Sequence, residues 1–238
     1  MRMRKKKNGE KRLESCSELL YERGEDTLSD PGAVMGMNGA PVFLEIGAGK
    51  GGFACEMARR NPSAAYFAME RVSDCAMLCA ERAMSMKEEG RDNLRIIVDT
   101  ADNLTRIFGE GTVSHIFLNF SDPWSKKGYA KRRLTHRRYL AVYLNLLCDG
   151  GKLTFKTDNV GLFDFSLSEV EAMGISLDKM TRDLHASEYN EGNVVTEYEE
   201  NFSSMGVNIN MLEFTKPVGY TVEIPDNLKR DRKDYRNG

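Results

Sequence analysis

Long apolar runs are absent from this sequence. No stretch approaches the roughly 18 apolar residues that a membrane span needs, and the basic segment 1–12 is not followed by the apolar run of a secretory signal. We therefore expect a cytoplasmic protein with no membrane partner. The 238 residues are 41% hydrophobic, which is globular composition with enough apolar side chains for one sizeable core.

Cysteine and histidine are scarce. The five cysteines are odd in number, scattered and without a CxxC pair, which argues against a disulfide framework and against a zinc knuckle. The three histidines are not spaced as a metal-binding pair. We therefore expect reduced thiols, no metal ion, and catalysis that does not depend on a histidine-centred triad.

Positive charge is unevenly distributed, although the formal net charge is only −2. The windows 1–12, 126–138 and 229–236 hold 19 of the 34 basic residues and three acidic ones, so the rest of the chain is acidic. Basic patches on an acidic body favour a polyanion held at defined places, because the acidic surface repels phosphate elsewhere. The two end windows are also typical of solvated tails, whereas the central one lies within the folded region.

Short apolar strands alternate with helices along the middle of the chain. We expect strands over 41–46, 64–69, 94–98, 113–120 and 152–157, with helices over 53–60, 72–87 and 139–148. This order predicts an α/β fold with a mostly parallel, doubly wound sheet covered on both faces. A later strand over 209–214 would add an antiparallel strand at the edge.

The sequence shows no internal repeat and no second domain. We place one domain over residues 41–215. Segments 1–40 and 216–238 are rich in charge and in turn-forming residues. We expect the first to be a mobile basic extension and the second a charged tail, each ordering only on a partner.

Glycines and carboxylates follow the predicted strands, where doubly wound sheets bind their ligands. The first strand runs into the glycine-rich turn 47–52, with Glu45 directly before it. Glycines let the backbone approach a ligand closely. Glu70 follows the second strand about 20 residues later, where a carboxylate can accept hydrogen bonds from ribose hydroxyls. A nucleoside-bearing cofactor fits this set.

The glycine spacing alone leaves the cofactor open, because Gly47, Gly49 and Gly52 also satisfy the GxGxxG pattern of nicotinamide and flavin enzymes. The GxxxxGK[ST] pattern of a P-loop is absent. A carboxylate at Glu45 suits a cofactor with an amino group and a sulfonium better than it suits a pyrophosphate. This favours S-adenosylmethionine over NAD. The alternative for Glu45 and Glu70 is an ordinary ion pair at a strand end.

The most specific motif is LNFSDPWSKK at 118–127, followed by KRR at 131–133. Together with LEIGAGKG at 44–51, FKTD at 155–158 and VTEYEENF at 195–202, it closely resembles the bacterial tRNA (guanine-N7)-methyltransferase family from about residue 41 to 214. The resemblance implies a Rossmann-like class I methyltransferase domain. It also implies transfer of a methyl group from S-adenosylmethionine to N7 of the guanine at tRNA position 46, in the variable loop, leaving S-adenosylhomocysteine.

Guanine N7 is already a lone-pair acceptor, so such a reaction needs positioning for in-line attack more than it needs a base. Methylation makes the purine cationic, and a carboxylate at its edge would stabilise the developing charge. The resemblance assigns catalysis and cofactor contact to Asp122. The alternative for Asp122 is a turn-forming residue before Pro123, and Trp124 could either stack on a base or pack the loop.

The resemblance and the strand-end positions together predict the other site residues. Cofactor contacts are expected at Glu45, Gly47, Gly49, Glu70, Thr100, Ala101 and Asp122. Substrate contacts are expected at Lys126, Asp158, Thr196, Glu197, Tyr198 and Glu199, and phosphate contacts at Lys131, Arg132 and Arg133.

Each substrate position also has a plainer interpretation. Asp158 could cap the helix that begins near residue 160, residues 196–199 have the spacing of a capping box, and Lys126 could be a solvated lysine. Two positions depart from the family pattern, because Thr100 stands where an Asp is usual and Gly128-Tyr129 replaces an Arg-His pair. We therefore expect details of adenine contact and tRNA contact to differ there.

Other function classes stay open at this point. A nicotinamide oxidoreductase would share the sheet and the glycine turn but leaves the central basic window unexplained. A non-catalytic RNA-binding protein would explain that window but not the carboxylates that follow the strands. A methyltransferase could also act on another RNA or on a small molecule. The expected partner is tRNA, and the sequence is compatible with a homodimer.

Overall fold

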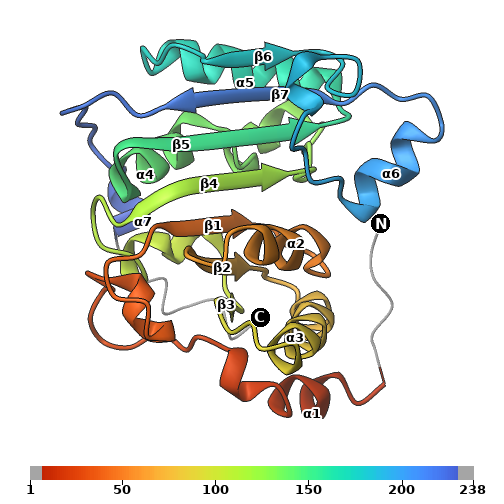
Figure 1. Ribbon diagram of the computed structural model, residues 1–238. Helices are drawn as coiled ribbons and strands as arrows, with labels where there is room; N and C mark the ends of the chain where they lie inside the picture. Colours follow the sequence, from red (N-terminus) through yellow and green to blue (C-terminus); the bar gives the residue numbers. More distant parts are fainter. Residues whose placement is uncertain (1–6, 230–238) are drawn as a thin grey trace.

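The computed structural model describes residues 7–229, in which a seven-stranded sheet has helices on both faces (Figure 1). The strand order is β3-β2-β1-β4-β5-β7-β6. Strands β1 to β5 run parallel to one another and β7 is antiparallel to β5, which confirms the predicted mostly parallel α/β sheet. The strands are β1 (Val42–Ile46), β2 (Ala65–Met69), β3 (Leu94–Ile97), β4 (Val113–Asn119), β5 (Leu147–Thr157), β6 (Lys179–Thr181) and β7 (Asn210–Thr215).

The edge of the sheet differs from the prediction. The segment expected to form the edge is β7, but β6 pairs antiparallel with its outer side. β6 has only three residues, Lys-Met-Thr, and no apolar alternation that would mark it in the sequence. It pairs because β7 presents a row of backbone groups that need partners. β7 is therefore an interior strand, one position from the edge.

Two helical layers enclose the sheet (Figure 1). One layer, over β1 to β3, contains α2 and α3, with the short α1 packed on α3; the other contains α4 and α5. α6 lies beyond the carboxyl ends of β4 and β5. The helices are α1 (Gly9–Glu14), α2 (Gly52–Arg60), α3 (Ser73–Glu88), α4 (Arg137–Leu146), α5 (Val160–Ala172), α6 (Glu197–Ser203) and α7 (Asp226–Lys229).

Two apolar cores lie on the two faces of the sheet. Leu44, Leu118 and Phe155 pack under α4 and α5, and Phe53 of α2 packs in the core of the other face. Strands covered on both faces are nearly all apolar because both sets of side chains are buried, and each large apolar side chain contributes about 1.5–3 kcal/mol. Glu45 breaks this rule, because it is buried on β1 within the second core region.

The described parts of the terminal segments pack on the sheet. Leu19 is buried, the N–H of Tyr21 donates to the Ile96 carbonyl on β3 (2.8 Å), and Leu228 is buried near the turn 101–106. Residues 7–40, expected to be mobile, thus pack on the domain: α1 contacts α3, Leu20 pairs with Ile96 on β3, and Leu28 pairs with Phe108. The boundaries at 41 and 215 stay predictions. Residues 1–6 and 230–238, with much of both terminal basic windows, lie outside the described residues.

Candidate functional site

A cavity of about 850 Å³ opens at the carboxyl ends of β1, β2 and β4. Parallel strands end at one edge of the sheet, so residues distant in sequence meet there. The predicted site residues that line the cavity are Gly47, Glu70, Thr100, Ala101, Asp122, Lys131 and Arg132. Predicted cofactor contacts and predicted phosphate contacts therefore face the same cavity.

The glycine turn is strained for any residue with a side chain. Gly47, Gly49 and Gly51 all have positive φ angles, of 85°, 55° and 76°. A Cβ at Gly51 would also collide with the Cys79 side chain on α3. The turn therefore brings α2 close to α3 and leaves bare backbone beside the cavity, which allows close approach of a ligand.

Glu70 links the end of β2 to this turn. Its Oε2 accepts a hydrogen bond from the Gly49 N–H (3.0 Å), and its Oε1 accepts one from the Val72 N–H (2.8 Å). A carboxylate oxygen has further lone pairs, and Glu70 lies on the cavity wall. Glu70 can therefore accept additional hydrogen bonds, as from the hydroxyls of a ribose, without losing the bonds that hold it.

Glu45 lies behind the cavity wall and is almost fully buried. Burial raises its pKa to about 7, while the hydrogen bond from Asn119 Nδ2 (2.9 Å) and the charge of Lys156 oppose that shift. Glu45 Oε2 and the Asn119 Oδ1 have no hydrogen-bond partner among the described residues. Two orphaned acceptors beside Gly47 fit a cofactor that brings an ammonium group, since each needs a donor.

The segment after β3 places two carboxylates on the cavity wall, Asp99 and Asp102, and both are hydrogen-bonded within the protein. Thr100 Oγ1 accepts from the Asp102 N–H (3.3 Å) and caps a 3-10 turn over Ala101–Arg106. Asp102 is engaged by Arg138 Nη2 (2.9 Å) and by the Tyr139 hydroxyl (2.8 Å). Thr100 therefore supplies a capping hydroxyl, while Asp102 pairs with Arg138 at the start of α4.

Asp122 lies at the mouth of the cavity with a largely exposed side chain, 3.3 Å from Arg71 Nη2. Phe120 and Trp124, on either side of it, have φ angles of 50° and 41°. Residues other than glycine rarely adopt this left-handed region, and such strain gathers where a site needs a special backbone path. The chain around Asp122 is therefore bent sharply.

The central basic window, residues 126–138, contains some cations that pair with carboxylates of the protein and others that are exposed. Arg137 pairs with Glu169 (2.8 Å) and Arg138 with Asp102, so both hold α4 in place. The guanidinium of Arg132 lies over the rings of Trp124 (5.1 Å) and Tyr129 (4.6 Å). Lys131 is exposed. This loop therefore offers Lys131 and Arg132 to a ligand of the cavity.

Arg133 differs from its two neighbours. It is half-buried and does not line the cavity. Its Nε donates to the Pro123 carbonyl (2.9 Å) and its Nη2 to the Trp124 carbonyl (3.2 Å). Arg133 was predicted to contact phosphate, but its guanidinium bonds the loop itself.

The segment 196–199 begins α6 with the capping box whose spacing the sequence shows. Thr196 Oγ1 accepts from the Glu199 N–H (2.9 Å). Glu199 is wholly buried, and its carboxylate contacts Lys156, His185 and Asn193. The predicted substrate contact at Glu199 is thus, in the structure, a buried anchor of α6.

Glu197 also has a protein partner, because it pairs with Arg82 of α3 and lies 3.6 Å from Lys50. Tyr198 is 45% exposed and packs against Phe120, with 5.0 Å between ring centroids. Burial, together with the nearby carboxylates of Asp158 and Asp122, raises the pKa of Tyr198. The structure thus brings Tyr198, Asp158 and Asp122 into one neighbourhood.

Within residues 7–229, the side chains of Asp158 and Lys126 make no hydrogen bond or ion pair that would explain them. The cap of α5 is Asn159, whose Oδ1 accepts from the Leu162 N–H (2.8 Å), so the capping alternative for Asp158 is wrong. Lys126 is exposed at the start of the 3-10 turn Lys127–Arg132. Both residues stay predicted substrate contacts.

Sequence reasoning missed several wall residues, among them Arg71, Asn119, Arg138 and Tyr139. Asn119 carried a usable signal, since it ends a strand beside the one that holds Glu45. Arg71 and Arg138 carried none, because an arginine next to an acidic residue or at a helix start is common on any surface.

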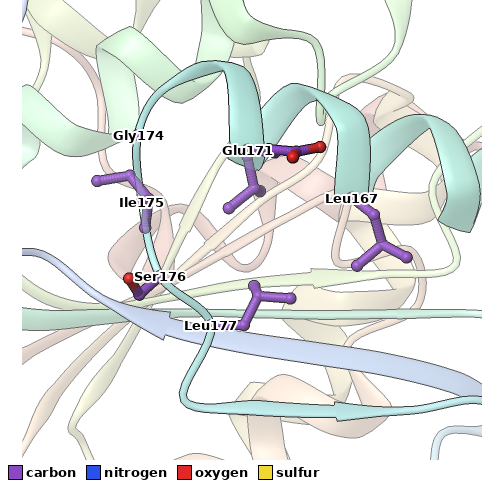
Figure 2. A pocket seen from close by; sticks show the side chains of 7 residues that line it. Leu167, Glu171, Gly174, Ile175, Ser176 and Leu177 are labelled. Carbon is purple, nitrogen blue, oxygen red and sulfur yellow. The ribbon is translucent and has the colours of Figure 1, made fainter.

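A second cavity, of about 580 Å³, lies between the last turns of α5 and the segment that leads to β6. Figure 2 shows Leu167, Ile175 and Leu177 on its wall with Glu171 nearby. None of the predicted site residues lines it. Its wall lacks the convergent polar groups of a ligand site, so the cavity at the strand ends is the candidate.

Along residues 7–229, no helix is both long and apolar enough to cross a membrane. In the same part of the chain, no three His, Cys, Asp or Glu side chains gather in a way that could hold a metal ion.

Comparison with known proteins agrees with the geometry. A family model described as "Putative methyltransferase" matches residues 39–212. The 16S rRNA methyltransferase KamB is similar in structure (TM-score 0.56, 16% identity), over 74% of this chain and 87% of that one. An antibiotic-related methyltransferase matches with TM-score 0.55 and 15% identity, over 84% and 100% of the two chains. Geranyl diphosphate methyltransferase, solved with GPP and sinefungin, matches with TM-score 0.50 and 17% identity, over 89% and 95%. At these identities the likeness shows the fold alone, the Rossmann-like sheet of class I methyltransferases that was predicted.

Proposed function

The chain belongs to the methyltransferase family whose model matches residues 39–212, and on that premise we propose that it methylates N7 of a guanine in tRNA. The methyl donor is S-adenosylmethionine and the target is position 46 in the variable loop. The observation that carries the proposal is the shared cavity. Its wall holds the ribose-type carboxylate Glu70, the carboxylate Asp122 and the cations Lys131 and Arg132.

The residues present fit this cofactor. Glu70 offers free lone pairs at the cavity wall, and Glu45 Oε2 and Asn119 Oδ1 are orphaned acceptors behind it. The bare backbone at Gly47 lets a ligand lie close. When bound, S-adenosylmethionine supplies an electrophilic methyl group on a positively charged sulfur. A volume of about 850 Å³ lies in the usual range for ligand sites, roughly 300–1,000 Å³.

Asp122 acts on the guanine. Its exposed carboxylate accepts a hydrogen bond from N1–H or from the exocyclic amine, and its charge offsets the positive charge that the purine gains. N7 already carries a lone pair, so no residue has to remove a proton first. The pair between Asp122 and Arg71 is exposed and therefore weak, so a base can replace Arg71 at the carboxylate.

The basic loop and α6 hold the RNA. Lys131 and Arg132 contact phosphates beside the cavity, which contributes affinity and salt dependence but little sequence discrimination. Tyr198 presents a half-exposed ring close to Asp158 and Asp122, and aromatic rings are the usual stacking surface for an unstacked base. These contacts support RNA over a small molecule as the substrate.

Site mapping on tRNA tests the proposal. Purified protein is incubated with S-adenosylmethionine and unmodified tRNA transcripts, and N7-methylguanosine is mapped by reduction and aniline cleavage. We expect cleavage at position 46, none in a transcript with adenine there, and loss of product in Asp122→Ala. Cleavage elsewhere, or methylation of 16S rRNA instead, would keep the enzyme class and overturn the substrate. Absence of any methylation would overturn the proposal.

A further inference from the structure

The loop that carries Asp122 has an unusual backbone path. Two residues with bulky side chains, Phe120 and Trp124, occupy the left-handed region at φ 50° and 41°. This conformation is unfavourable for any residue with a Cβ. The surrounding structure must therefore hold the loop in this path, because the five residues from Phe120 to Trp124 would relax if left to themselves.

One end of the loop is held by the sheet. The Phe120 N–H donates to the Lys156 carbonyl (2.9 Å), which extends the pairing between β4 and β5 past the end of β4. Among the described residues, the Asp122 carboxylate pairs with Arg71 alone, and that pair is exposed. The sheet therefore fixes the start of the loop, and the other end needs a separate support.

Arg133 supplies that support. Its Nε and Nη2 donate to the carbonyls of Pro123 and Trp124, at 2.9 and 3.2 Å, directly after Asp122. Its guanidinium lies over the Phe165 ring of α5, 4.4 Å from the ring centroid. The planar fork thus joins two successive carbonyls of the loop to the helix layer beneath it, which a guanidinium can do and an ammonium cannot.

Arg133 directs two of its five N–H donors to the loop. The neighbouring Lys131 and Arg132 are exposed and line the cavity, whereas Arg133 is half-buried and does not. Its Nε and Nη2 donate to two loop carbonyls and one face lies on the Phe165 ring, so the guanidinium is oriented toward the loop and α5 rather than toward the cavity.

We infer that Arg133 is a positioning residue that latches the loop of Asp122 in its productive path, and not a contact to the RNA backbone. The inference rests on the proposed function for the role of Asp122. It predicts that Arg133 acts on the rate of the chemical step, since displacement of a catalytic group by about 1 Å can cost about 100-fold in rate. A phosphate contact would act on affinity and its salt dependence instead.

Trp124 provides a readout that does not depend on activity, because it is the only tryptophan of the chain. Acrylamide quenching of its fluorescence reports how firmly the loop is held, and acrylamide is uncharged, so removal of a charge does not change its local concentration. The variants are Arg133→Ala, Arg133→Lys and Phe165→Leu, with Lys131→Ala as the matched control from the same loop. Thermal melting shows that each variant is folded before it is compared.

We expect the quenching constant of Arg133→Ala to rise about twofold or more, since a released loop side chain moves freely on the nanosecond scale. Arg133→Lys should behave like Arg133→Ala, Phe165→Leu should shift in the same direction by less, and Lys131→Ala should match wild type. A folded Arg133→Ala variant with the quenching constant of wild type would contradict the inference that Arg133 holds the loop. If Arg133→Ala fails to fold, Arg133→Lys and Phe165→Leu decide in the same way.

The second arm uses single-turnover methylation at saturating tRNA and cofactor, and tRNA affinity over a range of salt. Arg133→Ala should lose about 10- to 100-fold in rate, with an unchanged salt slope and no rescue by Arg133→Lys. Lys131→Ala should lower the slope by about 0.7–0.9. A normal rate with a lowered slope in Arg133→Ala, restored by lysine, would make Arg133 a phosphate contact. If wild-type protein methylates no tRNA, the proposed function fails, while the quenching arm still tests the latch.

Discussion

The ammonium of Lys156 lies 2.6 Å from the carboxylate of Glu199, and the side chains are only 4% and 0% exposed. Lys156 Nζ also donates to the Asn193 side chain (3.1 Å) and the Val194 carbonyl (3.0 Å), so all three of its protons are used. Glu199 closes the capping box of α6. This buried pair therefore joins the end of β5 to the helix that carries Tyr198.

Removal of Lys156 is predicted to unfold α6 or the whole domain. Lys156→Met leaves Glu199 buried without its cation, and such a change costs about 3–5 kcal/mol. Urea unfolding measures the loss. Lys156→Met combined with Glu199→Leu should recover part of it, because apolar residues can replace a buried pair. The control is Arg82→Ala, which breaks the exposed pair with Glu197 and should cost less than about 1 kcal/mol. Equal losses in the two single variants would contradict this account.

The buried Glu45 is predicted to make stability fall as pH rises. Burial raises its folded-state pKa from the ordinary 4.5 to about 7, so between these values the folded state binds more protons than the unfolded state. The free energy of unfolding therefore decreases from about pH 4.5 to 7, by about 3 kcal/mol for this group. Glu45→Gln has no such proton to lose.

Urea unfolding of wild type and Glu45→Gln at pH 5 and pH 8 checks this sign. The stability of wild type relative to the variant should be lower at pH 8 than at pH 5. The surface change Glu56→Gln, which removes an exposed pair with Arg60, should leave the pH profile unchanged. A difference between wild type and Glu45→Gln that does not vary with pH would show that Glu45 is ionised throughout.

Gly51 is predicted to tolerate no side chain. At φ 76° with Cys79 against it, Gly51→Ala combines left-handed strain with overpacking, and we expect a loss of about 3 kcal/mol in unfolding free energy. Gly47→Ala is the matched control, because its φ is also positive but no atom lies within 4 Å of the added Cβ. It should lose only the conformational part, about 1–2 kcal/mol. The thermal melts should therefore rank the two variants clearly, and a reversed order would be inconsistent with this packing.

Glu70 is predicted to decide cofactor affinity. Glu70→Gln keeps the shape but replaces a charged acceptor, and hydrogen bonds to charged groups contribute about 1.5–3 kcal/mol. S-adenosylhomocysteine should therefore bind about 10- to 100-fold more weakly, as measured by calorimetry. NADH should bind neither protein. Unchanged affinity in the variant would show that the ribose does not bind at the end of β2. Binding of NADH would instead support the oxidoreductase alternative.

Much of the sheet followed from local patterns. The five parallel strands and the three helices between them were placed within a few residues, except that β5 begins at Leu147 rather than at 152. Buried strands are continuous apolar runs, and helices begin and end at capping residues and prolines. Glu70 and Asp122 were found because ligands of such sheets bind at strand ends, and both line the cavity. The roles of these residues stay predictions.

Long-range contacts decided what local patterns could not. The same KRR run holds exposed Lys131 and Arg132 and the half-buried Arg133, and only the position of Phe165 and of the Pro123 and Trp124 carbonyls distinguishes them. Glu197 and Glu199 likewise cannot be distinguished by local sequence. Glu197 is half-exposed and pairs with Arg82, whereas Glu199 is buried against Lys156.

The sequence by itself determined the α/β class, which segments form the parallel strands, and which residues follow each strand. These features depend on the local hydrophobic period and on turn chemistry. Only the tertiary structure decided that β6 forms the edge, that residues 20 and 21 pair with β3, that Glu199 is buried against Lys156 and that Arg133 bonds the Pro123 carbonyl. The physical reason is that the partner of a charged side chain is often far away in the sequence. Only the folded structure brings the two side chains together.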